Sequence, residues 1–174
     1  MTSSLSAYNT VLLILRLVIG PTMAAHGYQK FFLGGKIPGT AGWFESLGMR
    51  KGTGKFHALT AASTEIGTGI LIAAGFLTPL AAAGFVGVMF VAGWIHKDHG
   101  FYVFKEGIEY NLVLAVVPAC IAGVGPGEWS IDHQLGWVGD LNGWRGMAIA
   151  FGVGIVASVG LLAAFYRPPK EPAS

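Results

Sequence analysis

Five apolar segments dominate the chain, and each is close to the length that a helix needs to cross a bilayer. They cover residues 8–25, 56–77, 79–95, 109–124 and 146–166. A membrane-spanning helix requires about 20 mostly apolar residues. Only 11% of the residues are charged, whereas soluble domains carry about 25%. The sequence therefore predicts an all-α fold, in which residues 1–174 form one polytopic membrane bundle of four core transmembrane helices and a fifth C-terminal one.

The connections between these segments predict a helical hairpin and a short surface helix. Thr78-Pro79 separates the second and third segments. Because proline suits the first turn of a new helix and disfavours helix in the residue before it, we expect a tight hairpin there. In the first loop, TAGWFESLGM (residues 40–49) sets Trp43 and Phe44 beside Glu45. Such a mixture of apolar and polar side chains is typical of an amphipathic interfacial helix.

The basic residues predict how the bundle is oriented. Of the eleven Lys and Arg residues, Arg16 lies inside the first segment and Arg145 lies on one side, while the other nine lie on the opposite side. The positive-inside rule then places the N-terminus outside and the C-terminus in the cytoplasm, and we expect the bacterial inner membrane. Residues 1–9 contain no Lys or Arg, so the first segment is expected to be an uncleaved span rather than a signal peptide.

Two charged residues interrupt the apolar segments at matching predicted depths. Arg16 lies nine residues before Ala25, and Glu65 lies nine residues after Phe56. At about 1.5 Å per residue, both lie roughly 13 Å from the same border. An unpaired charge there costs about 2.5–3.5 kcal/mol or more. We therefore expect an Arg16–Glu65 ion pair facing the bundle interior, which either fixes helix packing or forms a polar site for a membrane-soluble ligand or for protons.

A second polar group collects at the predicted cytoplasmic border. Its members are His26, Lys30, His57, His96 and Glu109. Border histidines are often ordinary interfacial residues, but this group could also form a mouth where a polar head group meets hydrogen-bond donors. The spacing of His96 and His99 is weak support for a metal, and Cys120 is the single cysteine. The sequence contains no flavin or haem motif, and we expect no metal site.

Several ordered blocks carry a resemblance to a known family. These are LRLVIGPTMAAHGYQKF, FESLG, STEIGTGILIAAGFLTPLAAAG and EYNLVLAVVPACIAGVGPGEWSID. Over residues 11–132 the chain resembles the DoxX/DoxD-related membrane proteins. The resemblance implies a four-helix core linked to quinone-dependent sulfur or redox metabolism. Members include the membrane subunit of a thiosulfate:quinone oxidoreductase and a mycobacterial component of a membrane oxidoreductase complex, while wider relatives serve as cargo receptors or assembly factors.

The resemblance also marks motif positions in this chain. They are Arg16, His26, Gly27, Lys30, Glu65, Gly69, Glu109, Gly125, Gly127, Ser130 and Asp132. The chain departs from the family pattern by its additional segment at 146–166. That segment could bind a partner or change the final topology.

Two classes of function fit these observations. The first is a membrane subunit of a quinone-linked oxidoreductase that acts on thiosulfate or other sulfur or thiol reductants. Its ligand-binding candidates are Arg16, His26, Lys30, Glu65 and Glu109, of which Glu65, Glu109 and His26 are also catalytic candidates. The second is a non-catalytic scaffold that recruits a soluble redox enzyme on the cytoplasmic side. The net charge of +2 is too small to favour nucleic acid as a partner.

Overall fold

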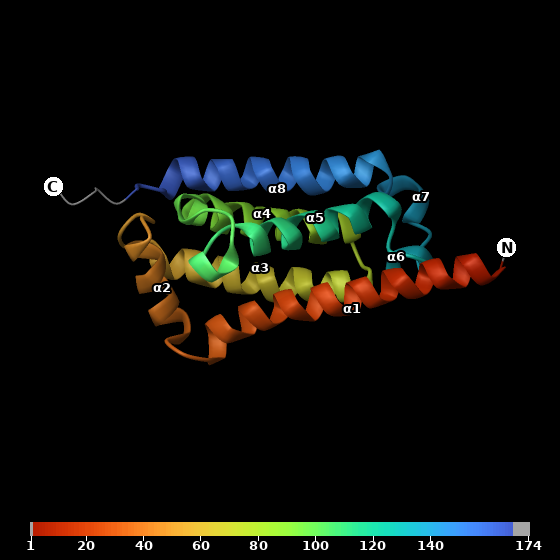
Figure 1. Cartoon of the computed structure of the whole chain (residues 1–174), viewed down its shortest axis with the longest axis horizontal. Coiled ribbons are helices and arrows are strands. Elements are labelled where there is room, and N and C mark those ends of the chain that lie inside the picture. The colour runs from red at the N-terminus through yellow and green to blue at the C-terminus, as the bar shows by residue number, and fades with distance from the viewer. Residues whose placement is uncertain (1, 169–174) are drawn as a thin grey trace.

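The computed structural model describes residues 2–168, and every regular element in this range is helical (Figure 1). Five long helices form the bundle: α1 (Thr2–Phe32), α3 (Gly54–Ala74), α4 (Thr78–His96), α5 (Glu109–Val124) and α8 (Trp144–Phe165). The connections contain α2 (Lys36–Ser46), α6 (Ile131–Gln134), α7 (Val138–Leu141) and two 3-10 turns, η1 (Lys97–His99) and η2 (Val103–Lys105). The predicted all-α class is confirmed.

Three of the described helices are long and apolar enough to cross a membrane. They are Ser4–Phe32, Thr78–His99 and Trp144–Phe165, and Glu109–Val124 is a shorter apolar helix. Together these helices identify an integral membrane protein. A short helix also lies in the first loop, but α2 begins at Lys36, upstream of the stretch 40–49 that the sequence pattern indicated.

Helices α1 and α3 run antiparallel and touch through glycines. A Cβ atom on Gly20 would lie 2.5 Å from the Gly69 carbonyl oxygen, and one on Gly69 would lie 2.5 Å from the Gly20 carbonyl oxygen. Seven residues further along α1, Gly27 stands just as close to the Ala62 carbonyl oxygen. Because only glycine permits this approach, small residues bring the two backbones together, as is common between helices in lipid.

The hairpin predicted at Thr78-Pro79 is present. Gly75 and Leu77 both adopt left-handed backbone conformations, with φ of 64° and 49°, and Pro79 lies in the first turn of α4. Leu77 is not a glycine, so this conformation costs free energy unless neighbouring contacts hold it. Those contacts come from Asp132, whose carboxylate accepts hydrogen bonds from the Leu77 and Thr78 amides at 2.8 and 2.9 Å and from the Thr78 hydroxyl at 2.6 Å.

The fifth long helix packs along α4 and is fastened at its far end. The Ser158 hydroxyl donates to the Gly87 carbonyl oxygen at 2.8 Å. At the end of α8, the Arg50 amide donates to the Phe165 carbonyl oxygen at 2.8 Å, and the Arg167 amide donates to the Gly48 carbonyl oxygen at 2.7 Å. Helix α8 is therefore joined both to α4 and to the connection between α2 and α3.

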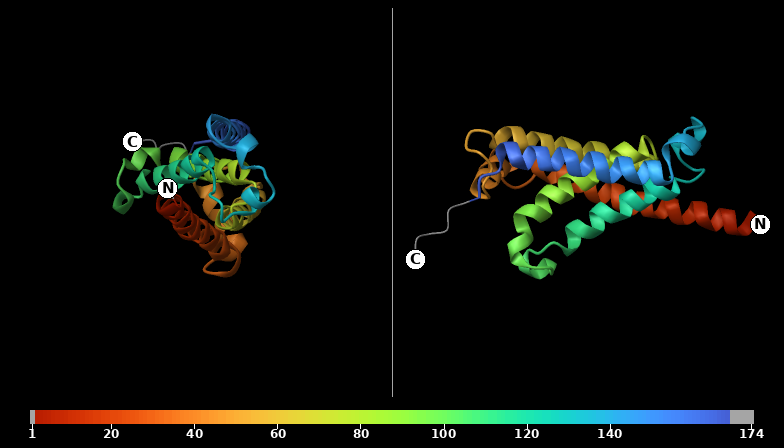
Figure 2. Two further views of the ribbon diagram at one scale, coloured as in Figure 1. Left: turned by 90° about the vertical axis from the view of Figure 1, so that its right-hand side faces the viewer. Right: turned by 90° about the horizontal axis from the view of Figure 1, so that it is seen from above.

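The α4–α5 hairpin leans away from the other long helices. In the right-hand view of Figure 2, α4 and α5 diverge from α3 and α8 toward the end that carries η1 and η2. At the opposite end, α6 and α7 join α5 to α8 beside the turn between α3 and α4 (Figure 1). The bundle is therefore closed at one end and splayed at the other.

The close contact of α1 with α3 predicts opposite responses at two glycines of one helix. Gly69→Ala should lower the thermal unfolding temperature, because its Cβ would meet the Gly20 carbonyl oxygen at 2.5 Å. Gly67→Ala is the matched control, since no atom lies within 4 Å of that Cβ position. Alanine is favoured over glycine inside a helix by about 0.5–1 kcal/mol, so Gly67→Ala should preserve or raise stability. Equal unfolding temperatures for the two detergent-purified variants would contradict this packing.

The Asp132 contacts predict a stability loss from an isosteric change. Asp132→Asn keeps the shape of the side chain but replaces one accepting oxygen with a donor group, leaving a buried hydroxyl or amide of the α4 start unsatisfied. Such a loss costs about 1–3 kcal/mol. Thermal unfolding should show the decrease for Asp132→Asn and none for Asp140→Asn, which changes an exposed carboxylate in α7. An unchanged transition for Asp132→Asn would show that these bonds do not hold the turn.

Candidate functional site

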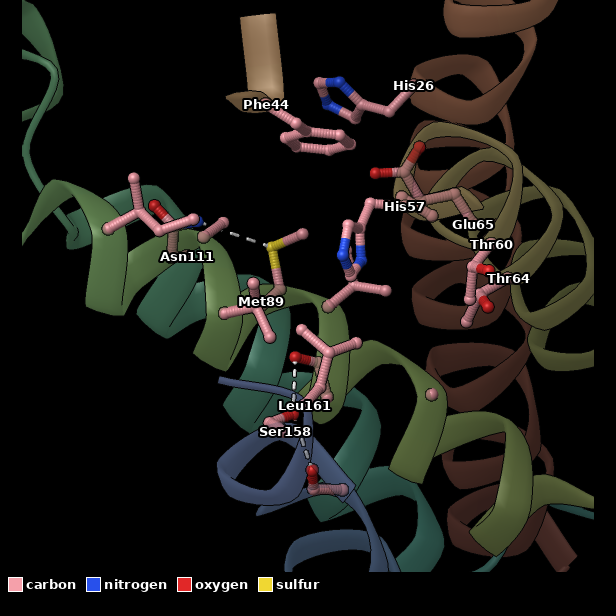
Figure 3. A pocket seen from close by; sticks show the side chains of 18 of the residues that line it. His26, Phe44, His57, Thr60, Thr64, Glu65, Met89, Asn111, Ser158 and Leu161 are labelled. Carbon is pink, nitrogen blue, oxygen red and sulfur yellow. Dashed lines mark hydrogen bonds between the residues drawn. The ribbon is translucent and has the colours of Figure 1, made fainter. Parts of the chain in front are cut away.

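A large cavity occupies the splayed end of the bundle. Its volume is about 630 Å³, and side chains from α1, α2, α3, α4, α5 and α8 line it. In Figure 3, His26, His57 and Glu65 lie on one side, Asn111 and Met89 lie opposite, and Ser158 and Leu161 of α8 lie below. Most of the lining is apolar. This combination of an apolar body and a few polar groups is typical of a site for a small organic ligand.

The principal charges of the cavity are a lysine and a glutamate that bind each other. Lys30 Nζ lies 2.8 Å from Glu65 Oε1 and 2.7 Å from Glu65 Oε2, so the ammonium contacts both carboxylate oxygens. The Glu65 side chain is 4% exposed and that of Lys30 is 19% exposed. Lys30 lies in the last turn of α1. Its long aliphatic chain carries the ammonium back to the carboxylate.

A second polar pair joins α1 to α5. His26 Nε2 lies 2.9 Å from the Tyr110 hydroxyl oxygen, within hydrogen-bonding distance. The two rings meet edge to face, with centroids 5.7 Å apart. Both side chains line the cavity beside Lys30 and Glu65. Since imidazole and phenol each donate or accept a hydrogen bond, this pair can present a donor to a ligand oxygen.

Two further polar side chains have spare hydrogen-bonding capacity. His57 Nε2 is buried and has no hydrogen-bond partner among residues 2–168, while its ring meets Phe165 of α8 edge to face. The Asn111 amide has a weak contact of 3.9 Å to the Met89 sulfur. Because both line the cavity, a ligand with polar atoms would find donors on opposite walls.

The predicted ion pair between Arg16 and Glu65 is wrong. Glu65 binds Lys30 instead, and Arg16 Nη2 donates to the Trp129 carbonyl oxygen. Arg16 is 1% exposed, and Asp132 is the negative charge that interacts with its guanidinium. Arg16 therefore belongs to the closed end of the bundle and is not among the residues that line the cavity.

The error lies in the assumed border of the first span. Helix α1 continues past Ala25 to Phe32, so Arg16 lies about 24 Å from the C-terminal end of this helix at 1.5 Å per residue. The glycine contacts fix the register, because Gly20 faces Ala73 as well as Gly69. One turn before Gly20 in α1, Arg16 therefore reaches Gly75 at the α3–α4 turn, and its Nη1 fills the space that a Cβ on Gly75 would need.

The remaining sequence candidates divide between the cavity and its surroundings. His26, Lys30, Glu65, His57 and His96 line the cavity, whereas Glu109 does not. Glu109 begins α5, and its amide donates to the Phe101 carbonyl oxygen at 2.8 Å. The two residues after it, Tyr110 and Asn111, line the cavity and were not singled out from the sequence. Their polar side chains at the start of an apolar segment were the available signal.

The burial difference within the Lys30–Glu65 pair predicts unequal effects of removing either partner. Lys30→Met would leave the buried carboxylate unpaired, and breaking a buried pair in this way costs about 3–5 kcal/mol. Glu65→Gln keeps an oxygen that can accept from Lys30, whose ammonium is also nearer to solvent. Thermal unfolding should rank Lys30→Met as the less stable variant, and the double variant should regain much of the loss. A more stable Lys30→Met than Glu65→Gln would refute this account of the pair.

Comparison with known proteins places this architecture in a family. The DoxX family matches residues 11–98, just over half of the 174-residue chain, from within α1 through α4. No curated protein and no solved structure matches the chain. The match includes the contact between α1 and α3, the Lys30–Glu65 pair and the α3–α4 hairpin. The chain belongs to the DoxX family.

Proposed function

We propose that this protein binds a quinone in the cavity, as the membrane subunit of a quinone-linked oxidoreductase. The observation that carries the proposal is the position of two polar pairs, Lys30–Glu65 and His26–Tyr110, on the wall of one apolar cavity. A quinone has an apolar ring and tail together with two carbonyl oxygens that accept hydrogen bonds. Its size is compatible with a cavity of about 630 Å³, which lies within the usual range of about 300–1,000 Å³ for ligand sites.

The lining supports a specific placement of the quinone head group. Donors on α1 and α5, from His26 and Tyr110, would face one carbonyl oxygen. Asn111 and His57 offer donors on other walls. The apolar side chains of α4 and α8 would contact the ring and tail. Arg16, a candidate from the sequence, has no part in this placement because it lies at the closed end.

The proposed reaction requires two electrons and two protons for each quinone that becomes a quinol. The chain has no flavin, nicotinamide or haem motif, so a small reductant or a partner protein must supply the electrons. Two thiosulfate ions could do so, each losing one electron as a sulfur–sulfur bond forms between them. His26 and Tyr110 can hold a proton at the ring, and Glu65 can exchange one through Lys30.

The same proposal includes the arrangement in the membrane. All five long helices would span the bilayer, with α2 at the cytoplasmic interface over the open end of the cavity. The N- and C-terminal ends of the described chain lie at opposite ends of the bundle (Figure 1), as an odd number of spans requires. The protein would lie in the inner membrane of a bacterial cell with its C-terminus in the cytoplasm. The loops richest in lysine and arginine would then lie on the cytoplasmic side, as the positive-inside rule requires.

A scaffold that recruits a soluble redox enzyme is the second candidate function. It is favoured by the exposed apolar segment of residues 101–104, which follows η1 and includes the first two residues of η2, and in which Phe104 is 76% exposed. Lys97 and Lys105 flank this segment. Stable co-purification of a redox enzyme, lost on Phe104→Ser and accompanied by no quinone binding, would favour the scaffold over the quinone subunit.

Quinone binding is tested by removing one hydroxyl from the cavity. Tyr110→Phe should weaken binding of a short-tailed quinone about 2–10-fold, as expected for one hydrogen bond of about 0.5–1.5 kcal/mol. Titration of the purified protein in lipid nanodiscs, followed by tryptophan fluorescence, measures the change. Tyr102→Phe is the matched control, because Tyr102 is exposed in the α4–α5 connection and does not line the cavity.

A second ligand separates recognition of the quinone head from simple partitioning. An alcohol bearing the same apolar tail but no quinone ring should bind more weakly and should not distinguish Tyr110→Phe from the unaltered protein. Equal binding of the quinone and the alcohol would contradict the proposed function. So would a Tyr110→Phe variant that binds the quinone as well as the Tyr102→Phe control.

A further inference from the structure

Three potential metal ligands meet in the connection between α4 and α5, at the rim of the cavity. His96 ends α4, His99 ends η1, and Glu106 follows η2. One ligand atom from each lies within 4.8 Å of the other two. The sequence spacing of the two histidines was weak support for a metal. The fold adds the carboxylate of Glu106, which lies ten residues after His96.

The individual contacts within this cluster leave ligand atoms available. His96 Nδ1 is buried and has no hydrogen-bond partner in the described part of the chain. His99 Nδ1 lies 3.8 Å from Glu106 Oε2, too far for a hydrogen bond. The rings of His96 and His99 meet at 61°, with centroids 5.5 Å apart. The three side chains are therefore close without satisfying one another.

The backbone conformation that places Glu106 beside the two histidines is energetically unfavourable for this residue. Glu106 has φ of 62°, one of three non-glycine residues with positive φ in the described chain. Its amide donates to the Val103 carbonyl oxygen at 2.8 Å, and the following Gly107 amide donates to the Tyr102 carbonyl oxygen at 2.9 Å. These bonds hold a left-handed conformation that is disfavoured for glutamate. Such conformations often occur at functional sites.

The two lysines of this connection are engaged elsewhere. Lys97 Nζ lies 3.1 Å from Asp98 Oδ2 and 5.3 Å from the centre of the Trp94 ring. Lys105 Nζ lies 6.0 Å from the centre of the Phe104 ring. Glu106 therefore has no lysine ion pair among the described residues. The carboxylate remains free to balance the charge of a cation.

We propose that His96, His99 and Glu106 bind a divalent transition-metal ion, with Zn²⁺ preferred. Two imidazoles and one carboxylate form a common zinc ligand set, whereas Mg²⁺ and Ca²⁺ prefer oxygen ligands. With bonds of about 2.0–2.1 Å in a tetrahedral site, ligand atoms lie roughly 3.3 Å apart. The side chains of His99 and Glu106 are 47% and 77% exposed, so their rotation can close the present distances.

The proposed metal site would fasten the splayed end of the α4–α5 hairpin. His96 and Glu106 also line the cavity, and the His96 ring lies 6.3 Å from that of Trp43 in α2. A metal there would connect the end of α4 to the start of α5 beside the cavity mouth. Three protein ligands leave a fourth coordination position for water or for a polar ligand atom. The site does not depend on quinone binding.

Cobalt is a suitable probe because tetrahedral Co²⁺ has intense visible absorption and Zn²⁺ displaces it. The full chain, purified in detergent with a tag that contains no histidine and stripped of metal, should bind one Co²⁺ with a tetrahedral spectrum. Zn²⁺ should abolish that spectrum and raise the thermal unfolding temperature. Loss of a residue that only hydrogen-bonds to a metal ligand costs roughly 10–100-fold in metal affinity. Because His99 and Glu106 are proposed to be ligands themselves, His99→Gln and Glu106→Gln should each reduce Co²⁺ affinity by more than that.

The matched control is His133→Gln. His133 is an exposed histidine of α6 at the closed end of the bundle, so its removal should leave Co²⁺ binding unchanged. Failure of the unaltered chain to bind Co²⁺ would overturn the proposal. So would binding without tetrahedral absorption, or retention of full affinity by His99→Gln, whose exposed position makes it tolerant of substitution.

Discussion

The close contact of α1 with α3 determines where the charged residues Arg16, Lys30 and Glu65 lie. Gly20 and Gly69 bring the two backbones together, and the contact of Gly27 with Ala62 extends the same register by seven residues. A shift by one helical turn would place a Cβ against a carbonyl oxygen. The register therefore brings Lys30 to Glu65 at one end and Arg16 to the α3–α4 turn at the other. Backbone packing, rather than charge attraction, sets these pairings.

The three charged residues of this interface are accommodated in two ways. Lys30 and Glu65 neutralise each other through two short contacts. Arg16 instead donates to the backbone at Trp129 and interacts electrostatically with Asp132, which itself holds the start of α4. Arg16 thus connects α1 to the α5–α6 connection and the turn at the closed end. An unpaired charge in an apolar environment costs free energy, so a helix packing that removed either set of partners would be disfavoured.

Much of the fold follows from local patterns in the sequence. Positions 16, 20, 23 and 27 of α1 follow one another at three- and four-residue steps and so share one helical face, and Arg16, Gly20, Met23 and Gly27 are all buried. The Thr78-Pro79 hairpin was also predicted correctly. The partner of Glu65 was not, because the first span was expected to end at Ala25, with Lys30 at the border beyond it. A lysine whose charge is neutralised by a buried glutamate no longer marks a border, and only the tertiary register reveals that.

The cavity depends on long-range geometry that no local pattern encodes. Its polar wall needs α1 and α5 to place His26 beside Tyr110, residues that are 84 positions apart. Its apolar wall needs α8, which lies outside the DoxX match at 11–98. The contacts of Asp132 and Arg16 hold one end of the bundle closed. Helices α4 and α5 therefore diverge from α3 and α8 at the other end (Figure 2). The same contacts that make the bundle stable therefore determine where a ligand can enter it.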